Sequence, residues 1–203
     1  MYRVDAHSYL ERARERLNEG RLDSLFYAAL ELRCGIESRL QEYLEAQEHI
    51  AECRRSGWRI PKLGKNIERA FQLGNKIARV TILDPNTKEE IASLIYTPVT
   101  SELQKNGQRL GHLLHALKRA RPLDDPWWSE TREFLEKVQA QLAVAVSGTL
   151  LGPMIWNPKT REAIMRQELG PGQDPKSLME RIGRIGGRTV IKVEYLEQMP
   201  SGK

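Results

Sequence analysis

The chain has 203 residues, a formal net charge of +5 at pH 7 and a hydrophobic fraction of 40%. A chain of this length buries roughly 70% of its unfolded surface, so it can fold without disulfides or structural metal. Its two cysteines, Cys34 and Cys53, exclude a disulfide framework and a zinc ribbon. No apolar run approaches the roughly 20 residues that span a bilayer, and the polar N-terminal segment lacks the apolar stretch of a signal peptide. We therefore expect a cytoplasmic protein that does not associate with membranes.

Apolar residues recur at spacings of three and four over much of the chain, which is typical of amphipathic helices. The first two predicted helices meet at Gly20, and two helices joined by a tight break form an antiparallel hairpin. The predicted helices cover residues 6–19, 23–54, 61–71, 101–120 and 127–146.

The period changes from helical to extended at two places. Residues 77–83 and 91–97 are rich in β-branched side chains and flank an Asp84-Pro85 turn, which predicts a β-hairpin. After Gly148 the composition shifts to glycine, proline and short strands, with a second turn at Asn157-Pro158.

The last strand is predicted over 188–196, after a short helix over 175–183. We expect the two hairpins and this strand to pair in one small antiparallel sheet.

These elements predict an α+β fold that is predominantly helical. An antiparallel helical bundle occupies residues 1–148, and the β-hairpin at 77–97 is inserted into it. Residues 149–203 form a small strand-rich segment, which we expect to pack on the bundle.

Two histidines lie on the polar face of the helix predicted over 101–120. His112 and His115 fall about 140° to 200° around that helix from Leu110, which belongs to its apolar stripe. A solvated polar face is one interpretation of this placement. A metal site is another, but no third ligand shares the face, so we expect no metal or other cofactor.

The third interpretation of these histidines is phosphodiester chemistry. A histidine can remove the proton of a ribose hydroxyl or protonate a leaving oxygen near neutral pH. Arg109 on the same helix can stabilise the charge that develops on a phosphate.

The helical hairpin at 5–54, the pair Arg109 and His115, and the closing helix at 127–146 resemble the HEPN superfamily of compact helical bundles. Residues 25–37 also look like the second helix of such proteins. In active members an arginine and a histidine a few residues later meet across a homodimer and cleave RNA without metal. The resemblance therefore implies an endoribonuclease of a defence or toxin–antitoxin type, with Arg109 stabilising phosphate and His115 or His112 as acid and base.

A basic segment with one tryptophan is the strongest local pattern for nucleic-acid binding. Trp58 follows Arg54 and Arg55 and precedes Arg59, so cations and an aromatic ring alternate. Arg119 belongs to a second basic run at the end of the histidine helix. Both runs are equally consistent with ordinary helix ends, where cations complement the helix dipole.

Arg33 and Glu37 are one helical turn apart at the edge of the second helix's apolar stripe. We expect a structural ion pair that fixes packing between helices, with an RNA contact as the alternative. The whole chain also admits a second class of function, in which the helices dimerise or bind a protein partner without catalysis.

Overall fold

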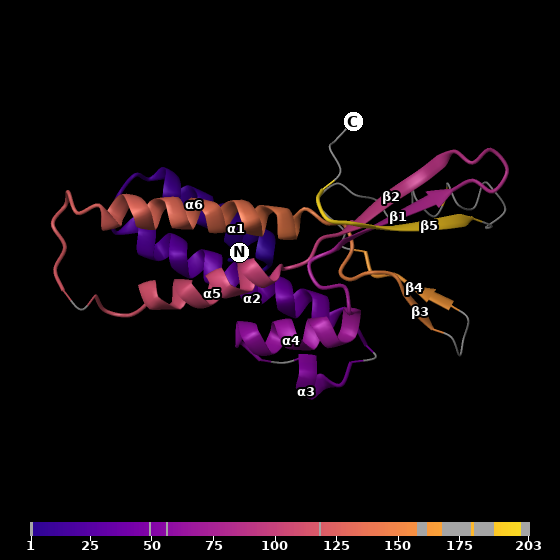
Figure 1. Ribbon diagram of the computed structural model, residues 1–203, viewed down its shortest axis with the longest axis horizontal. Coiled ribbons are helices and arrows are strands. Elements are labelled where there is room, and N and C mark those ends of the chain that lie inside the picture. Colours follow the sequence, from indigo (N-terminus) through magenta and orange to yellow (C-terminus); the bar gives the residue numbers. More distant parts are fainter. Residues whose placement is uncertain are drawn as a thin grey trace. The chain divides into compact units, whose positions relative to one another are not determined.

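A computed structural model describes residues 2–48, 50–55, 57–117, 119–157, 162–167, 180 and 189–199 (Figure 1). The predicted α+β, predominantly helical fold class is confirmed. The helices are α1 (Ala6–Asn18), α2 (Ser24–Glu45), α3 (Glu52–Arg55), α4 (Ile60–Phe71), α5 (Ser101–Leu113) and α6 (Trp127–Val146). The strands are β1 (Ile77–Leu83), β2 (Glu90–Tyr96), β3 (Ile155–Asn157), β4 (Glu162–Ile164) and β5 (Val190–Leu196).

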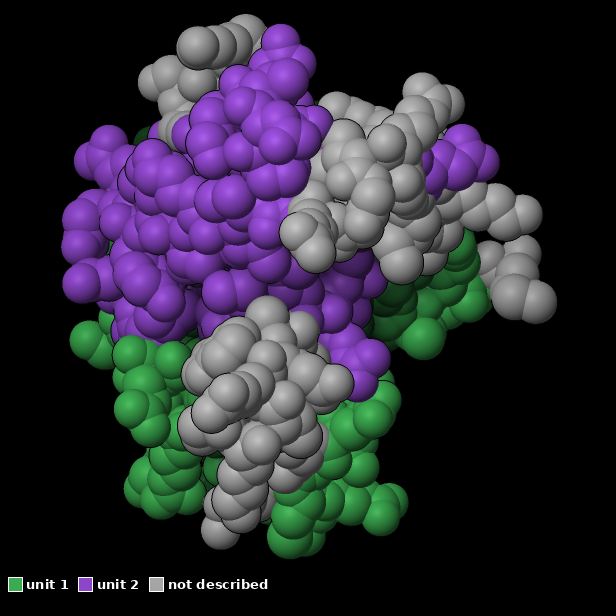
Figure 2. Space-filling model, turned by 90° about the vertical axis from the view of Figure 1, so that its right-hand side faces the viewer, with its two compact units in different colours: residues 1–72, 99–147 green, residues 73–98, 148–203 purple. Residues whose placement is uncertain are grey.

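The chain divides into two compact units, which Figure 2 shows in different colours. Unit 1 is the helical bundle, residues 1–72 and 99–147. Unit 2 combines residues 73–98, which contain the β1–β2 hairpin, with residues 148–203. The strand-rich C-terminal segment and the inserted hairpin therefore belong to the same unit.

Unit 1 is built around α2, which packs against α1, α4, α5 and α6. Side chains from several sides of α2 are buried, and Leu25, Leu32 and Ile36 are at most 1% exposed. A helix that is apolar on most of its surface belongs in a core, so α2 takes the central place. Gly35 allows the close approach of its neighbours, because an added Cβ would lie 2.8 Å from Leu142 of α6.

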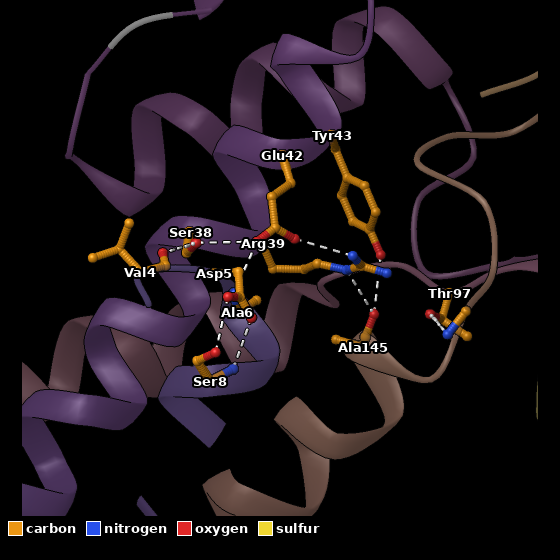
Figure 3. Close-up of polar contacts among 11 residues, drawn as sticks. Val4, Asp5, Ala6, Ser8, Ser38, Arg39, Glu42, Tyr43, Thr97 and Ala145 are labelled. Atoms are coloured by element: carbon orange, nitrogen blue, oxygen red, sulfur yellow. Dashed lines mark hydrogen bonds and ion pairs between the residues drawn. The ribbon is translucent and has the colours of Figure 1, made fainter. Parts of the chain in front are cut away.

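A charge pair near the C-terminal end of α2 joins two other helices to it (Figure 3). The Arg39 Nη1 donates to Glu42 Oε2 over 3.0 Å, and its Nε donates to the Ala145 carbonyl over 3.1 Å. Glu42 Oε1 accepts the Ala6 amide at 2.8 Å, and the Tyr43 hydroxyl donates to the same Ala145 carbonyl. The carboxylate thus lies at the positive N-terminus of α1, and the guanidinium lies at the negative C-terminus of α6.

The order of unit 2's three-stranded antiparallel sheet is β2-β1-β5, so β1 is central. Val80 of β1 pairs with Leu94 of β2 and with Val193 of β5. The predicted pairing of the hairpin with the last strand is therefore confirmed.

The second hairpin, β3–β4, forms a separate two-stranded sheet, so the expectation of a single sheet is wrong. Residues 149–150 bond to β2 at Ile95 instead. The amides of Thr149 and Leu150 donate to the Ile95 carbonyl over 2.7 and 3.0 Å, and the Ile95 amide donates to the Thr149 hydroxyl.

Helix periodicity predicts most of the bounds closely. The predicted helices over 6–19, 61–71 and 127–146 correspond to α1, α4 and α6, and the predicted strands over 77–83 and 91–97 correspond to β1 and β2. The helix predicted over 175–183 lies outside the described residues, apart from Glu180. No helix in the described part of the chain has the length and apolar content needed to cross a bilayer.

The long helix predicted over 23–54 is wrong in its last third, because α2 ends at Glu45. The sequence there contains no glycine or proline. The chain turns at Gln47, which is 3% exposed, and brings α4 back onto α2, where the Tyr43 and Phe71 rings meet edge to face. Burying the apolar face of α4 outweighs two more turns of helix.

The helix predicted over 101–120 is also too long, since α5 ends at Leu113. On a continued helix Leu114 and Leu117 would extend the apolar stripe of Leu110, yet each is 39% exposed. Residues 114–117 are all exposed, so no burial of apolar surface stabilises a helix that continues past Leu113.

Replacing Arg39 with Met should lower the free energy of unfolding by about 3 to 5 kcal/mol, because Glu42 loses its buried partner and the α6 carbonyl loses its donor. Urea unfolding followed by circular dichroism measures the change. Arg14→Met is the control: it breaks the exposed ion pair with Glu11 and should cost no more than about 0.5 kcal/mol. Equal losses in the two variants would contradict the role given to Arg39.

Gly148→Ala should destabilise the fold by about 1 to 3 kcal/mol. A Cβ at Gly148 would lie 2.9 Å from both the Ile95 carbonyl oxygen and the Thr97 amide nitrogen, and backbone atoms cannot move aside cheaply. The same urea titration measures the change in the free energy of unfolding. Ser147→Ala, at the neighbouring exposed position, is the control. An unchanged midpoint for Gly148→Ala would show that residue 148 does not pack tightly against β2.

Candidate functional site

An open cleft of about 670 Å³ lies in unit 1 beyond the end of α5. Residues 112–121 form most of its wall, and the first turn of α6 completes it. We call it the histidine cleft. Its polar lining in the described chain is His112, His115, Arg119 and Arg121. No carboxylate is among the described residues that line it, so the cleft favours anions.

One wall of the histidine cleft is fixed by Arg121 and Trp127. The Arg121 guanidinium lies 4.3 Å from the centre of the Trp127 ring and donates to Asp125 Oδ2 over 3.0 Å. The Trp127 amide donates to Asp125 Oδ1 over 3.0 Å. That hydrogen bond, helped by Arg121, holds the pKa of Asp125 below its usual value, so the carboxylate stays charged near neutral pH.

Aromatic rings support this wall from within the bundle. Trp127 and Trp128 contact each other edge to face at 4.9 Å, and both contact Phe26 of α2 at 6.3 and 6.1 Å. The Trp128 indole also donates to the Pro122 carbonyl over 2.8 Å. The loop between α5 and α6 is therefore anchored where it carries Arg121.

A smaller hollow of about 290 Å³ adjoins the histidine cleft and shares His112, Leu113 and Trp127 with it. Arg109 lines this hollow, with its guanidinium 4.4 Å from the centre of the Phe134 ring of α6. Arg109 and His112 are one helical turn apart on α5, so their side chains reach the same hollow.

The structure thus groups the three catalytic candidates differently from the arrangement that the sequence predicts. Arg109 shares a hollow with His112, and His112 shares the histidine cleft with His115. His115 lies beyond the end of α5, so its predicted place on the helix's polar face is wrong. Both histidines are solvent-exposed, as substrate access to them requires.

No group of three or more His, Cys, Asp or Glu side chains that could hold a metal ion occurs among the described residues. The described side chains of the cleft supply two imidazoles and two guanidinium groups. An imidazole can donate or accept a proton, and a guanidinium group can bind and polarise a phosphate.

Arg33 and Glu37 lie on the side of α2 that faces α5. The Arg33 Nε is 3.1 Å from Glu37 Oε1, and its Nη1 donates to the Gly107 carbonyl over 3.3 Å. A Cβ at Gly111 would lie 2.7 Å from that same Nη1, so the glycine leaves room for the guanidinium. Burial raises the pKa of Glu37, and the attraction of Arg33 opposes the rise without cancelling it.

The predicted basic segment around Trp58 spans α3 and the start of α4. Trp58 is 67% exposed and Arg59 is exposed, whereas Arg55 is half-buried. The side chain of Arg54 lies outside the described residues. Arg119, which the sequence places in a second basic run, lines the histidine cleft instead of extending a helix.

Sequence reasoning missed Arg121 and the aromatic support behind it. The sequence does contain a pattern that favours this contact: Arg121 and Asp125 are four residues apart, and Trp127 lies two residues after Asp125. These residues lie between two predicted helices, and only the fold brings Phe26 into contact with the two tryptophans.

Compared with known proteins, the chain matches no family model, no curated protein and no solved structure. The geometry of the cleft therefore carries the functional argument, together with the resemblance drawn from the sequence.

The raised pKa of Glu37 has a consequence for stability. A folded state that holds this carboxyl at a raised pKa binds its proton more readily than the unfolded chain does. The contribution of Glu37 to the free energy of unfolding is therefore greatest at low pH and is lost as pH rises through the folded pKa.

In Glu37→Gln this dependence should be absent. The unfolding free energy of the wild type minus that of the variant should fall as the pH rises above about 4, as measured by urea titration at several pH values. A difference that stays flat or rises with pH would contradict the assigned shift.

Proposed function

We propose that this chain is a HEPN-like protein that binds RNA in the histidine cleft and cleaves it without a metal ion. The observation that carries the proposal is one open cleft in which His112 and His115 stand among arginines, with no carboxylate in its described lining. Such a lining attracts phosphate and supplies groups that gain and lose protons near neutral pH. A role in defence or in a toxin–antitoxin pair follows from the family resemblance.

The proposed reaction transfers the phosphate within the RNA strand. One histidine removes the proton of a ribose 2′-hydroxyl, whose oxygen forms a bond to phosphorus. The bond from phosphorus to the 5′-oxygen breaks, and the other histidine protonates that leaving oxygen. The products are a 2′,3′-cyclic phosphate and a 5′-hydroxyl.

Arginine side chains stabilise the charge that grows on the phosphate during this step. Arg109 is placed to do so beside His112, because both line the smaller hollow. Arg121 is held by Asp125 and Trp127, so its position costs little reorganisation when a phosphate arrives. Arg119 adds a third positive charge at the cleft.

The test is cleavage of a fluorescent single-stranded RNA by the purified protein in excess EDTA. His112→Ala and His115→Ala should each slow cleavage about 100-fold or more, since each removes a proton-transfer group. Arg109→Ala should slow it about 100-fold, because a charge-stabilising donor is lost.

His7→Ala is the matched control, since His7 is exposed on α1 and does not line the cleft. It should cleave at the wild-type rate. The nuclease proposal fails if the folded wild type does not cleave RNA, if EDTA abolishes cleavage, or if the cleft variants retain full activity.

A non-catalytic dimerisation or protein-binding module is the second candidate. The observation that favours it is the exposure of leucines around the same loop: Leu114 and Leu117 at 39% and Leu123 at 84%. Exposed leucines that lie close together are typical of contact surfaces. A folded dimer in light scattering that becomes a monomer in Leu117→Ser and that never cleaves RNA would favour this function over the nuclease.

A further inference from the structure

Helix α4 has one buried face and one strongly basic face. Its apolar side chains Ile60 and Leu63 are at most 1% exposed and pack in the bundle, where α4 contacts α2 and α5. Three exposed cations of α4, Lys62, Lys65 and Arg69, lie on the opposite side, within an arc of about 60° on an ideal helix and over about 10 Å of its length. The exposed Arg59 directly precedes the helix as its N-cap residue. We call Arg59, Lys62, Lys65 and Arg69 the α4 stripe.

The cations of the α4 stripe lack carboxylate partners among the described residues. Several other exposed arginines of the bundle do pair with carboxylates, as in Arg14 with Glu11 at 2.6 Å and Arg21 with Asp23 at 2.7 Å. In the described chain no ion pair joins the α4 stripe to any carboxylate. The helix itself carries a single carboxylate, Glu68, which has a contact of its own. Four cations whose charge the fold leaves uncompensated favour a polyanion as ligand.

An exposed tryptophan lies at the N-terminal end of the stripe. Trp58 directly precedes Arg59 and is 67% exposed, and no ring or cation of the described chain contacts its indole. Trp127 and Trp128, in contrast, pack against Phe26. A free indole beside a row of cations is the arrangement on which unpaired bases stack in single-strand binding proteins.

We infer that the α4 stripe and Trp58 bind single-stranded RNA, with phosphates along α4 and an unpaired base on the Trp58 ring. The inference rests on the proposed function for its choice of RNA and adds a second contact surface, outside the histidine cleft. An anionic lipid surface fits less well, because the apolar face of α4 is buried in the bundle and, among the described residues of α4 and its N-terminal flank, Trp58 is the one exposed aromatic side chain.

The test measures binding of a fluorescein-labelled uridine oligonucleotide of about 20 residues by anisotropy, between about 50 and 200 mM KCl. His112→Ala/His115→Ala serves as the background, so that the strand stays intact. Lys62→Gln/Lys65→Gln should reduce the slope of log affinity against log salt by about 1.4, since each phosphate contact to a single strand contributes about 0.7. Trp58→Ala should weaken binding about tenfold and leave the slope unchanged.

The matched control is Lys76→Gln/Lys88→Asn, which removes the same charge from exposed lysines of unit 2. Asparagine is chosen at position 88 because Lys88 has φ 62°, which asparagine tolerates. This variant should bind with the affinity and salt slope of the background protein. Circular dichroism checks that all variants are folded.

Binding that is unchanged in both Lys62→Gln/Lys65→Gln and Trp58→Ala would overturn the inference. So would a stripe-dependent affinity for phosphatidylserine vesicles with none for RNA. The experiments distinguish failure of the proposed nuclease function from failure of the proposed RNA binding by the α4 stripe. If RNA binds through the α4 stripe but is never cleaved, only the nuclease proposal is overturned. If the wild type cleaves RNA and the stripe variants bind it normally, only the proposed RNA binding by the α4 stripe is overturned.

Discussion

The helical bundle depends on a charge pair that lies out of water. Arg39 has no exposed surface, and a buried guanidinium is costly unless charged and polar partners surround it. Those partners come from its own helix and from the end of α6, while Glu42 reaches the first residue of α1. Three helices must therefore be in place together before the charge is satisfied, which makes their assembly cooperative.

The sequence predicts those elements whose stability is local. The apolar period of α1, α4 and α6 and the β-branched runs of β1 and β2 give their bounds to within a few residues. It does not predict where α2 and α5 end, because no residue there stops a helix and the decision lies with tertiary burial. Nor does periodicity predict the charge network: a helical wheel places Arg39 at the edge of the apolar stripe of α2 but does not identify the Ala145 carbonyl of α6 that it meets.

The candidate site, too, is predictable from the sequence only in its local features. Arg109, His112 and His115 could be selected from the sequence because they are chemically distinctive and close along the chain. Their grouping could not, because a helical wheel assumes a helix that continues past Leu113. The cleft exists because the chain leaves α5 and returns to α6 over the rings of Phe26 and Trp127. That path is set by contacts between residues about a hundred positions apart.

The order of the three-stranded sheet sets the order in which unit 2 can be completed. β1 is its central strand, yet its partner β5 lies more than a hundred residues later in the chain, where Ile77 pairs with Leu196. While the chain is being synthesised, β1 has one open edge until residues 190–196 emerge from the ribosome. Open strand edges recruit other strands, so a nascent or truncated chain is the form of this protein most exposed to aggregation.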